Sequence, residues 1–322
     1  MDVAALLGAL FNIFLVVFIV ASMLSAGFTT TVPNLVSVLK RYWLILAVLA
    51  GAFILRPLAG WAIAELFSLE TDAFIALIIL ASVAGAPLGV KFVMAAGGSL
   101  TTGAALQVML AVISSFTFAP TANFLLEAAD LGADISLPVW DILRAVVVLQ
   151  LVPFAIGMLS RYWVEESALE WNKTAVKISG PSFLAFLALG ILGSWQLIID
   201  LLGDRAILAG IAFAIVALII GYVVSYGDRK TRETTSLIEV GTNAGPAFAA
   251  IAIAFNNKVE IVGAAVAMLL IQIILGIVMG GYFGKSRGGD EAEAAANGGE
   301  GEGSAESGSA PAESGAAPVA SE

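Results

Sequence analysis

Nine long apolar runs, joined by short polar links, determine what this 322-residue chain can fold into. A helix needs about 20 predominantly apolar residues to cross the hydrocarbon core of a bilayer, and each run reaches that length. We therefore predict an all-α polytopic membrane protein with nine transmembrane helices, surrounded mainly by the lipid bilayer. The predicted spans are 4–30, 42–66, 72–96, 102–127, 138–160, 178–200, 206–226, 234–256 and 259–284.

The composition excludes several classes of protein. Hydrophobic residues make up 60% of the chain and charged residues only 12%, whereas about one quarter of a soluble domain is charged. Cysteine and histidine are both missing, which removes thiolate sites, the commonest metal ligand and the usual base near neutral pH. We therefore expect that the protein is not an enzyme and that it binds no cofactor. The net charge of −10 argues against a nucleic-acid partner.

Charges in the links predict how the chain is oriented. If the N-terminus lies outside, ten basic residues fall on the inside and two on the outside, as the positive-inside rule requires. Adding or removing one span would destroy this asymmetry. We predict a multi-pass protein of the cell membrane with a cytoplasmic C-terminus. The inside residues are Lys40, Arg41, Arg161, Lys173, Lys177, Arg229, Lys230, Arg232, Lys285 and Arg287; the outside residues are Arg205 and Lys258.

The C-terminal segment 288–322 differs in composition from the rest. It is rich in Gly, Ala, Ser and Glu, carries eight acidic residues and no basic one, and lacks aromatic residues. Such a segment cannot bury enough apolar surface to offset the entropy of ordering. We predict a disordered acidic tail in the cytoplasm.

Helix-breaking residues interrupt the third and eighth spans. Proline removes a backbone donor, and unwound backbone at membrane depth is tolerated only where protein or a water-filled cavity satisfies it. One interrupted span in each half is typical of transporters built from inverted repeats, here 1–135 and 136–287. The two spans run in opposite directions, so their breaks are expected to cross near mid-depth. The breaking residues are Gly85, Pro87 and Gly89, and Gly241, Gly245 and Pro246.

The second break carries candidate ligands. Glu239 lies just before it, and an ionised carboxylate in hydrocarbon is costly unless it binds a cation or a proton. Thr242 and Asn243 add oxygen atoms of the kind that hard cations prefer. The alternatives are a glutamate held by a neighbouring helix, and Thr242 or Asn243 as caps of the following half-helix.

Several other polar residues also lie within the predicted spans. Lys91 follows the first break and either snorkels to the interface or meets Glu239, or an anionic substrate, at the crossing. Arg56 is expected to pair within the bundle or face a cavity. Gln107, Gln150 and Gln196 are expected to form interhelical hydrogen bonds, whereas Gln272 is the glutamine best suited to line a cavity.

Four segments resemble the bile acid:sodium symporter family over residues 4–284. "IEVGTNAG" (238–245) is similar to the family's Glu-x-Gly-x-Gln-Asn-Ser/Ala-Gly motif, and "GAPLGVKFVM" (85–94) stands where the family has a Pro-Gly-Gly crossover followed by Ser-Asn. "SMLSAGFTT" (22–30) and "RAVVVLQLVPFAIGMLSR" (144–161) are weaker matches in the right order. The resemblance implies ten helices in two inverted repeats that form a panel and a core domain. Here the first helix is missing, which leaves repeats of four and five helices.

The resemblance further implies a secondary active transporter that moves a small organic anion with sodium by alternating access. Glu239 and Asn243 match sodium ligands of the family, but Lys91 stands where its Ser-Asn pair is expected. We therefore expect sodium or proton coupling, with Lys91 replacing one sodium ion. Bile acids, keto acids, hydroxy acids and sulfated compounds all remain open as substrates. The alternative is a receptor or sensor that keeps the fold without transporting.

Overall fold

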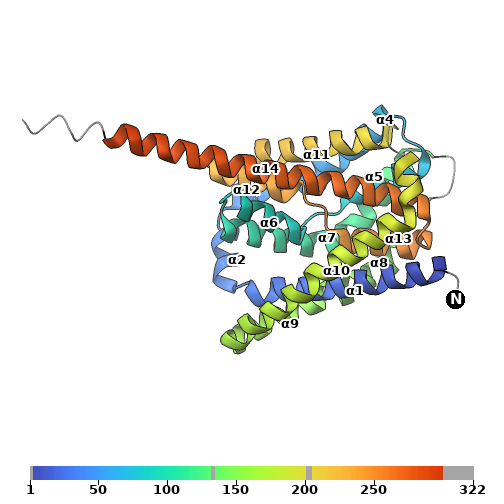
Figure 1. Ribbon diagram of the computed structural model, residues 1–322, viewed down its shortest axis with the longest axis horizontal. Coiled ribbons are helices and arrows are strands. Elements are labelled where there is room, and N and C mark those ends of the chain that lie inside the picture. The colour runs from blue at the N-terminus through green and yellow to red at the C-terminus, as the bar shows by residue number, and fades with distance from the viewer. Residues whose placement is uncertain (1–2, 132–134, 201–204, 300–322) are drawn as a thin grey trace, which may run out of the picture. The chain divides into compact units, whose positions relative to one another are not determined.

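The computed structural model describes residues 3–131, 135–200 and 205–299, and this part of the chain is helical without strands (Figure 1). The helices are α1 (Val3–Thr29), α2 (Val32–Leu39), α3 (Tyr42–Ala50), the π-helix η1 (Gly51–Leu55), α4 (Arg56–Leu66), α5 (Thr71–Ser82), α6 (Pro87–Ala95), α7 (Leu100–Ala128), α8 (Val139–Val146), the π-helix η2 (Val147–Leu151), α9 (Val152–Trp163), α10 (Glu165–Asp200), α11 (Arg205–Val224), α12 (Arg229–Glu239), α13 (Ala244–Phe255) and α14 (Val259–Gly299).

The spans agree with the predicted apolar runs. Among the described residues, eight helical segments are long and apolar enough to cross a membrane. Helices α5 and α6 together satisfy the same test but are bent by 70° at their junction, and counting them as one broken span gives nine. The chain is therefore a helical polytopic membrane protein, and the number nine depends on this bent pair.

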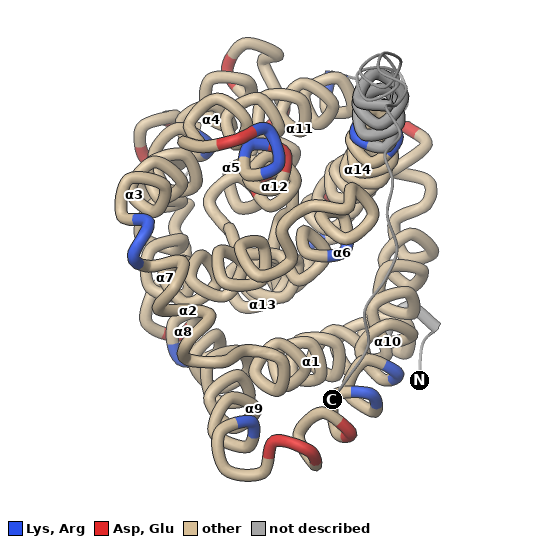
Figure 2. Tube along the Cα trace, turned by 90° about the vertical axis from the view of Figure 1, so that its left-hand side faces the viewer, with Lys and Arg blue, Asp and Glu red and all other residues tan. Residues whose placement is uncertain are grey.

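Helix α1 packs mainly against α10 and α9, and the three lie together in both views (Figures 1 and 2). The contact between α1 and α9 is close because glycines face each other there. A Cβ added at Gly27 would lie 2.8 Å from the Cα of Gly157, which no real side chain allows. Aromatic rings connect α1 and α10 to α13. Phe11 of α1 and Phe186 of α10 contact each other and Phe248 of α13 edge to face.

Two helices differ from the prediction, one in where it begins and one in being present at all. Helix α10 begins at Glu165 and not near residue 178, and its first turn carries Glu165 and Glu166, which favour a helix N-terminus. Helix α2 was not predicted. It begins at a Thr31 cap whose side chain accepts from the Asn34 amide, with Pro33 in the first turn.

Helix α14 continues past the predicted start of the tail. The compact unit of residues 1–284 ends within it, and residues from Lys285 onward form a separate unit. The helix extends to Gly299, so the disorder predicted from residue 288 is not seen before that residue. The segment "EAEAAA" explains the difference, since alanine and glutamate are strong helix formers. The rest of the predicted tail, 300–322, lies outside the described residues.

Basic residues gather at the end of the molecule where α12 begins. Figure 2 looks onto this end and shows Lys and Arg in the α2–α3 link, at the start of α12, and on α9 and α10. This distribution agrees with the predicted asymmetry, while the side of the membrane on which this end lies remains a prediction.

The first turn of α12 depends on Asp228. Its carboxylate accepts from the Thr231 amide at 3.0 Å, and hydrogen bonds from Thr231 lower the pKa of Asp228. We expect Asp228→Ala to lower the free energy of unfolding by about 1 kcal/mol at pH 7. Because the folded pKa is depressed, this difference should be lost as the pH falls through the folded pKa, below about 3.9. Denaturant unfolding in detergent at pH 7 and pH 3 measures it, and Asp228→Asn, which keeps an acceptor, should lose much less.

Candidate functional site

The first break separates α5 from α6 and contains a glycine that no other residue can replace easily. Residues 83–86 are not helical, and Gly85 has a φ of +83°. A Cβ added at Gly85 would lie 2.6 Å from the Cα of Ala111 in α7. The freed backbone groups find partners on α7, since the Ala84 amide donates to Ser114 Oγ and Gln107 Nε2 donates to the Gly85 carbonyl.

The second break separates α12 from α13 and lies slightly earlier than predicted. Residues 240–243 are not helical, which places Gly241 inside the break. Gly245 and Pro246 instead belong to the first turn of α13. Proline is well tolerated there because the amide it lacks would have no partner within the helix.

The two breaks touch each other, as predicted. A Cβ added at Gly241 would lie 2.9 Å from the Cβ of Ala86 in the first break. One added at Gly89 of α6 would lie 3.3 Å from both the Cα of Ile238 and the carbonyl oxygen of Leu237 in α12. Glycines at these positions allow the broken helices to cross with their backbones in close contact.

A fully buried arginine joins the two breaks. Arg56 begins α4, directly after η1, and has no exposed surface. Its Nη1 donates to the Val83 carbonyl at 2.6 Å, and its Nη2 donates to the Leu80 carbonyl at 3.1 Å and to Thr242 Oγ1 at 2.5 Å. The guanidinium thus occupies carbonyls at the C-terminal end of α5, where the helix dipole favours a cation. The ring of Phe213 lies on another side, 5.5 Å from Cζ.

Thr242 connects this arginine to the last span. Its hydroxyl donates to Gln272 Oε1 at 2.6 Å, and both side chains are buried. Gln272 Nε2 has no hydrogen-bond partner in the described part of the chain. Thr242 and Gln272, both predicted as site residues, are therefore in contact at the crossing.

Asn243 contacts a different helix. It stands at the N-cap position of α13, where its side chain makes no capping hydrogen bond, and its Nδ2 donates to Gln150 Oε1 at 3.0 Å. Gln150 lies on η2, and its Nε2 donates to the Ala111 carbonyl and to Ser115 Oγ on α7. Turns of π-helix often occur at functional sites. Here the turn places one amide where it bridges the second break and α7.

Glu239 is buried at the end of α12 without a hydrogen bond. It is 2% exposed, and neither carboxylate oxygen has a partner among the described residues. Its side chain faces η1 and α11, since a Cβ added at Gly51 would lie 3.6 Å from Oε1. The charged group that acts on it is Arg56. A buried carboxylate with free lone pairs is rare in folded proteins and indicates a place for a proton or a cation.

A family model described as the Sodium Bile acid symporter family matches residues 15–199 of this chain. The chain belongs to this family. Membership identifies a multi-span membrane protein of a transporter family, with symport of organic anions as its general activity. The matched segment contains the first break, Arg56 and Gln150, whereas the second break lies beyond it. Among curated proteins no match was found.

In this family member Lys91 does not meet Glu239, so that one of the two interpretations of this lysine is wrong. Lys91 is exposed, and it forms no ion pair with Glu239 within the residues that the structure covers. The reason is helical geometry. Gly89 faces α12, and a residue two positions further along an α-helix is rotated by about 200° and faces away. The buried cation at the crossing is Arg56, whose signal in the sequence was a lone charge in the middle of an apolar span.

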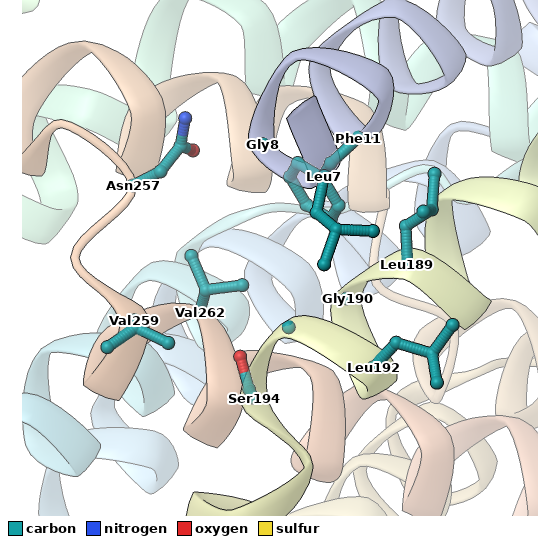
Figure 3. A pocket seen from close by; sticks show the side chains of 11 residues that line it. Leu7, Gly8, Phe11, Leu189, Gly190, Leu192, Ser194, Asn257, Val259 and Val262 are labelled. Carbon is teal, nitrogen blue, oxygen red and sulfur yellow. The ribbon is translucent and has the colours of Figure 1, made fainter. Parts of the chain in front are cut away.

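An apolar hollow of about 410 Å³ lies away from the crossing, between α1, α10 and the start of α14 (Figure 3). Leucine and valine side chains line most of it, with the hydroxyl of Ser194 and the amide of Asn257 as polar groups. Among the described residues none of those that line it is basic, so they offer no positive charge to an organic anion.

Proposed function

We propose that the protein is a secondary active transporter that moves a small organic anion across the cell membrane by alternating access, coupled to sodium or to a proton. The main support for this proposal is the crossing of two broken helices, where a buried arginine and a buried carboxylate lie. Broken helices that cross at mid-depth are the arrangement in which transporters bind substrate and coupling ion. Family membership supports the organic anion as substrate.

A hollow of about 400 Å³ between α1, η2 and α13 supports an access route. Asn12, Asn256 and Asn257 are the polar residues among those that line it. Ile19, Leu149 and Ala249 line both this hollow and a much smaller space beside Gln150 and Pro246. The route therefore leads toward the crossing, and the hydrogen bond between Gln150 and Asn243 closes it. Under the predicted orientation this hollow faces the outside.

We also propose that α1, α8–η2–α9 and α10 form the panel and that the other spans form the core, in inverted repeats of four and five helices. Alternating access would then be a movement of the core along the panel. The bond between Gln150 of the panel and Asn243 of the core would break and form again in each cycle.

Uptake into proteoliposomes tests this function. The full chain is reconstituted and given labelled taurocholate, pantoate, pyruvate or a sulfated steroid, under separate sodium and proton gradients. We expect saturable uptake of at least one anion, above that of protein-free liposomes. Saturable binding without uptake for every anion would contradict transport and favour the receptor alternative.

We expect Gln150→Ala to lower the free energy of unfolding by about 1–3 kcal/mol, because it leaves the buried Asn243 amide without its acceptor and removes one of the two hydrogen bonds of Ser115. Denaturant unfolding in detergent measures this loss. Gln196→Ala is the matched control, since Gln196 lies exposed on α10 and should change stability by less than about 0.5 kcal/mol. Equal losses in the two variants would show that the Gln150 bridge is not formed.

A further inference from the structure

The oxygen atoms around the Arg56 guanidinium form the kind of set that binds a hard cation. Two are backbone carbonyls, of Leu80 and Val83, and the third is the hydroxyl of Thr242. The amide oxygen of Gln272 lies behind that hydroxyl. Carbonyl, hydroxyl and amide oxygens are typical ligands of alkali and alkaline-earth cations, and both carbonyls also stand at the negative end of the α5 dipole.

In this chain a side chain already occupies that set. Arg56 reaches all three oxygens from one planar group, and the guanidinium keeps its charge at any pH that the protein meets. A sodium ion at the same place would have to displace a fully buried guanidinium and leave it without partners. The residues present therefore do not fit a sodium ion between these oxygens.

The crossing already contains a buried cation that belongs to the chain. Arg56 is fully buried, and it is the charged group that acts on the buried Glu239 carboxyl. Among the charged residues on helices that pack against α12, Lys91 of α6 is exposed, and Glu127 of α7 and Arg205 of α11 lie near the ends of their helices. In the described part of the chain, the buried cation at the crossing is thus Arg56.

We propose that Arg56 is a built-in cation that takes the place of a mobile sodium ion at the crossing, so that this family member holds its anion-binding conformation without sodium there. The inference rests on the proposed transport function, but its claim that no sodium ion binds at the crossing can be tested separately. It also assigns to Arg56 the role that the sequence suggested for Lys91.

Thermal unfolding of the purified full chain in detergent tests the proposal with sodium alone as the probe. Sodium chloride is compared with potassium chloride at equal ionic strength and pH. We expect no shift of the wild-type midpoint between the two salts. Arg56→Gln removes the built-in cation and frees the oxygens, so its midpoint should rise with sodium concentration and saturate. Arg56→Lys, which keeps a charge at the site, should not respond to sodium.

A saturable, sodium-specific rise of the wild-type midpoint would overturn the proposal, and so would an Arg56→Gln variant that folds but ignores sodium. If Arg56→Gln cannot be purified, the wild-type comparison decides alone. Uptake separates this inference from the proposed function. Uptake that strictly requires sodium would contradict the built-in cation and leave transport standing. Absence of uptake in every salt would contradict transport, and the midpoints would still decide the question of sodium.

Discussion

Arg56→Ala is expected to lower the free energy of unfolding by about 3–5 kcal/mol, among the largest losses that a single substitution in this protein can cause. The variant leaves the Val83 carbonyl without its donor and removes one of the two donors to the Leu80 carbonyl, which keeps the Thr242 hydroxyl. It also removes the buried cation that acts on the buried Glu239 carboxyl without a hydrogen bond to it in the described part of the chain. Denaturant unfolding in detergent measures the loss. Lys91→Ala is the matched control, because that exposed cation should change stability by less than about 0.5 kcal/mol.

A second substitution separates the charge from the hydrogen bonds. If Glu239 is the uncompensated group, Glu239→Gln in the Arg56→Ala background should recover part of the lost stability, because it removes the buried charge. The lost donors to α5 would remain unreplaced, so recovery should be incomplete. A double variant that is less stable than Arg56→Ala would show that the two side chains do not interact.

Gly85→Ala is expected to cost about 3 kcal/mol or more and to reduce the yield of folded protein. Two independent effects add at this residue. The backbone has a φ of +83°, which strains any residue with a Cβ, and the added Cβ would overlap the backbone of Ala111. The backbone of α7 cannot move aside as a flexible side chain would, so the break itself would have to change shape.

The control for Gly85→Ala is Gly180→Ala. Gly180 lies within α10, and a Cβ added there meets nothing within 4 Å. Alanine at such a position is neutral or stabilises by up to about 1 kcal/mol. The two variants can be compared by size-exclusion elution and thermal unfolding. A Gly85→Ala protein as stable as Gly180→Ala would mean that the first break does not have the described conformation.

Much of the fold could be predicted because lipid imposes simple rules on a sequence. Each apolar run is helical over most of its length, and the Gly/Pro clusters gave breaks in the third and eighth runs, since both signals are local. The ends of elements were less predictable. The start of α10 and the extension of α14 depend on polar residues that form helix outside any apolar run, where run length gives no information.

The candidate site was predicted only in part. Glu239, Thr242 and Asn243 were expected at the second break and are buried there, and Gln272, expected to line a cavity from the last span, is buried and accepts from Thr242. Gln150, expected as one of several interhelical glutamines, turned out to bridge the second break and α7. The sodium role of Glu239 and Asn243 stays a prediction.

The sequence by itself determined the membrane class, the positions of the spans and the two interrupted helices, because apolar length and helix-breaking residues act on neighbouring residues only. The tertiary structure decided which cation lies at the crossing. Lys91 is nearer to a break in the sequence, yet it is exposed because the side of α6 that meets α12 carries Gly89. Arg56 reaches the break from another span because its side chain is directed at the carbonyls that end α5. The direction of a side chain depends on which helix faces it, and that follows only from the packing of the whole bundle.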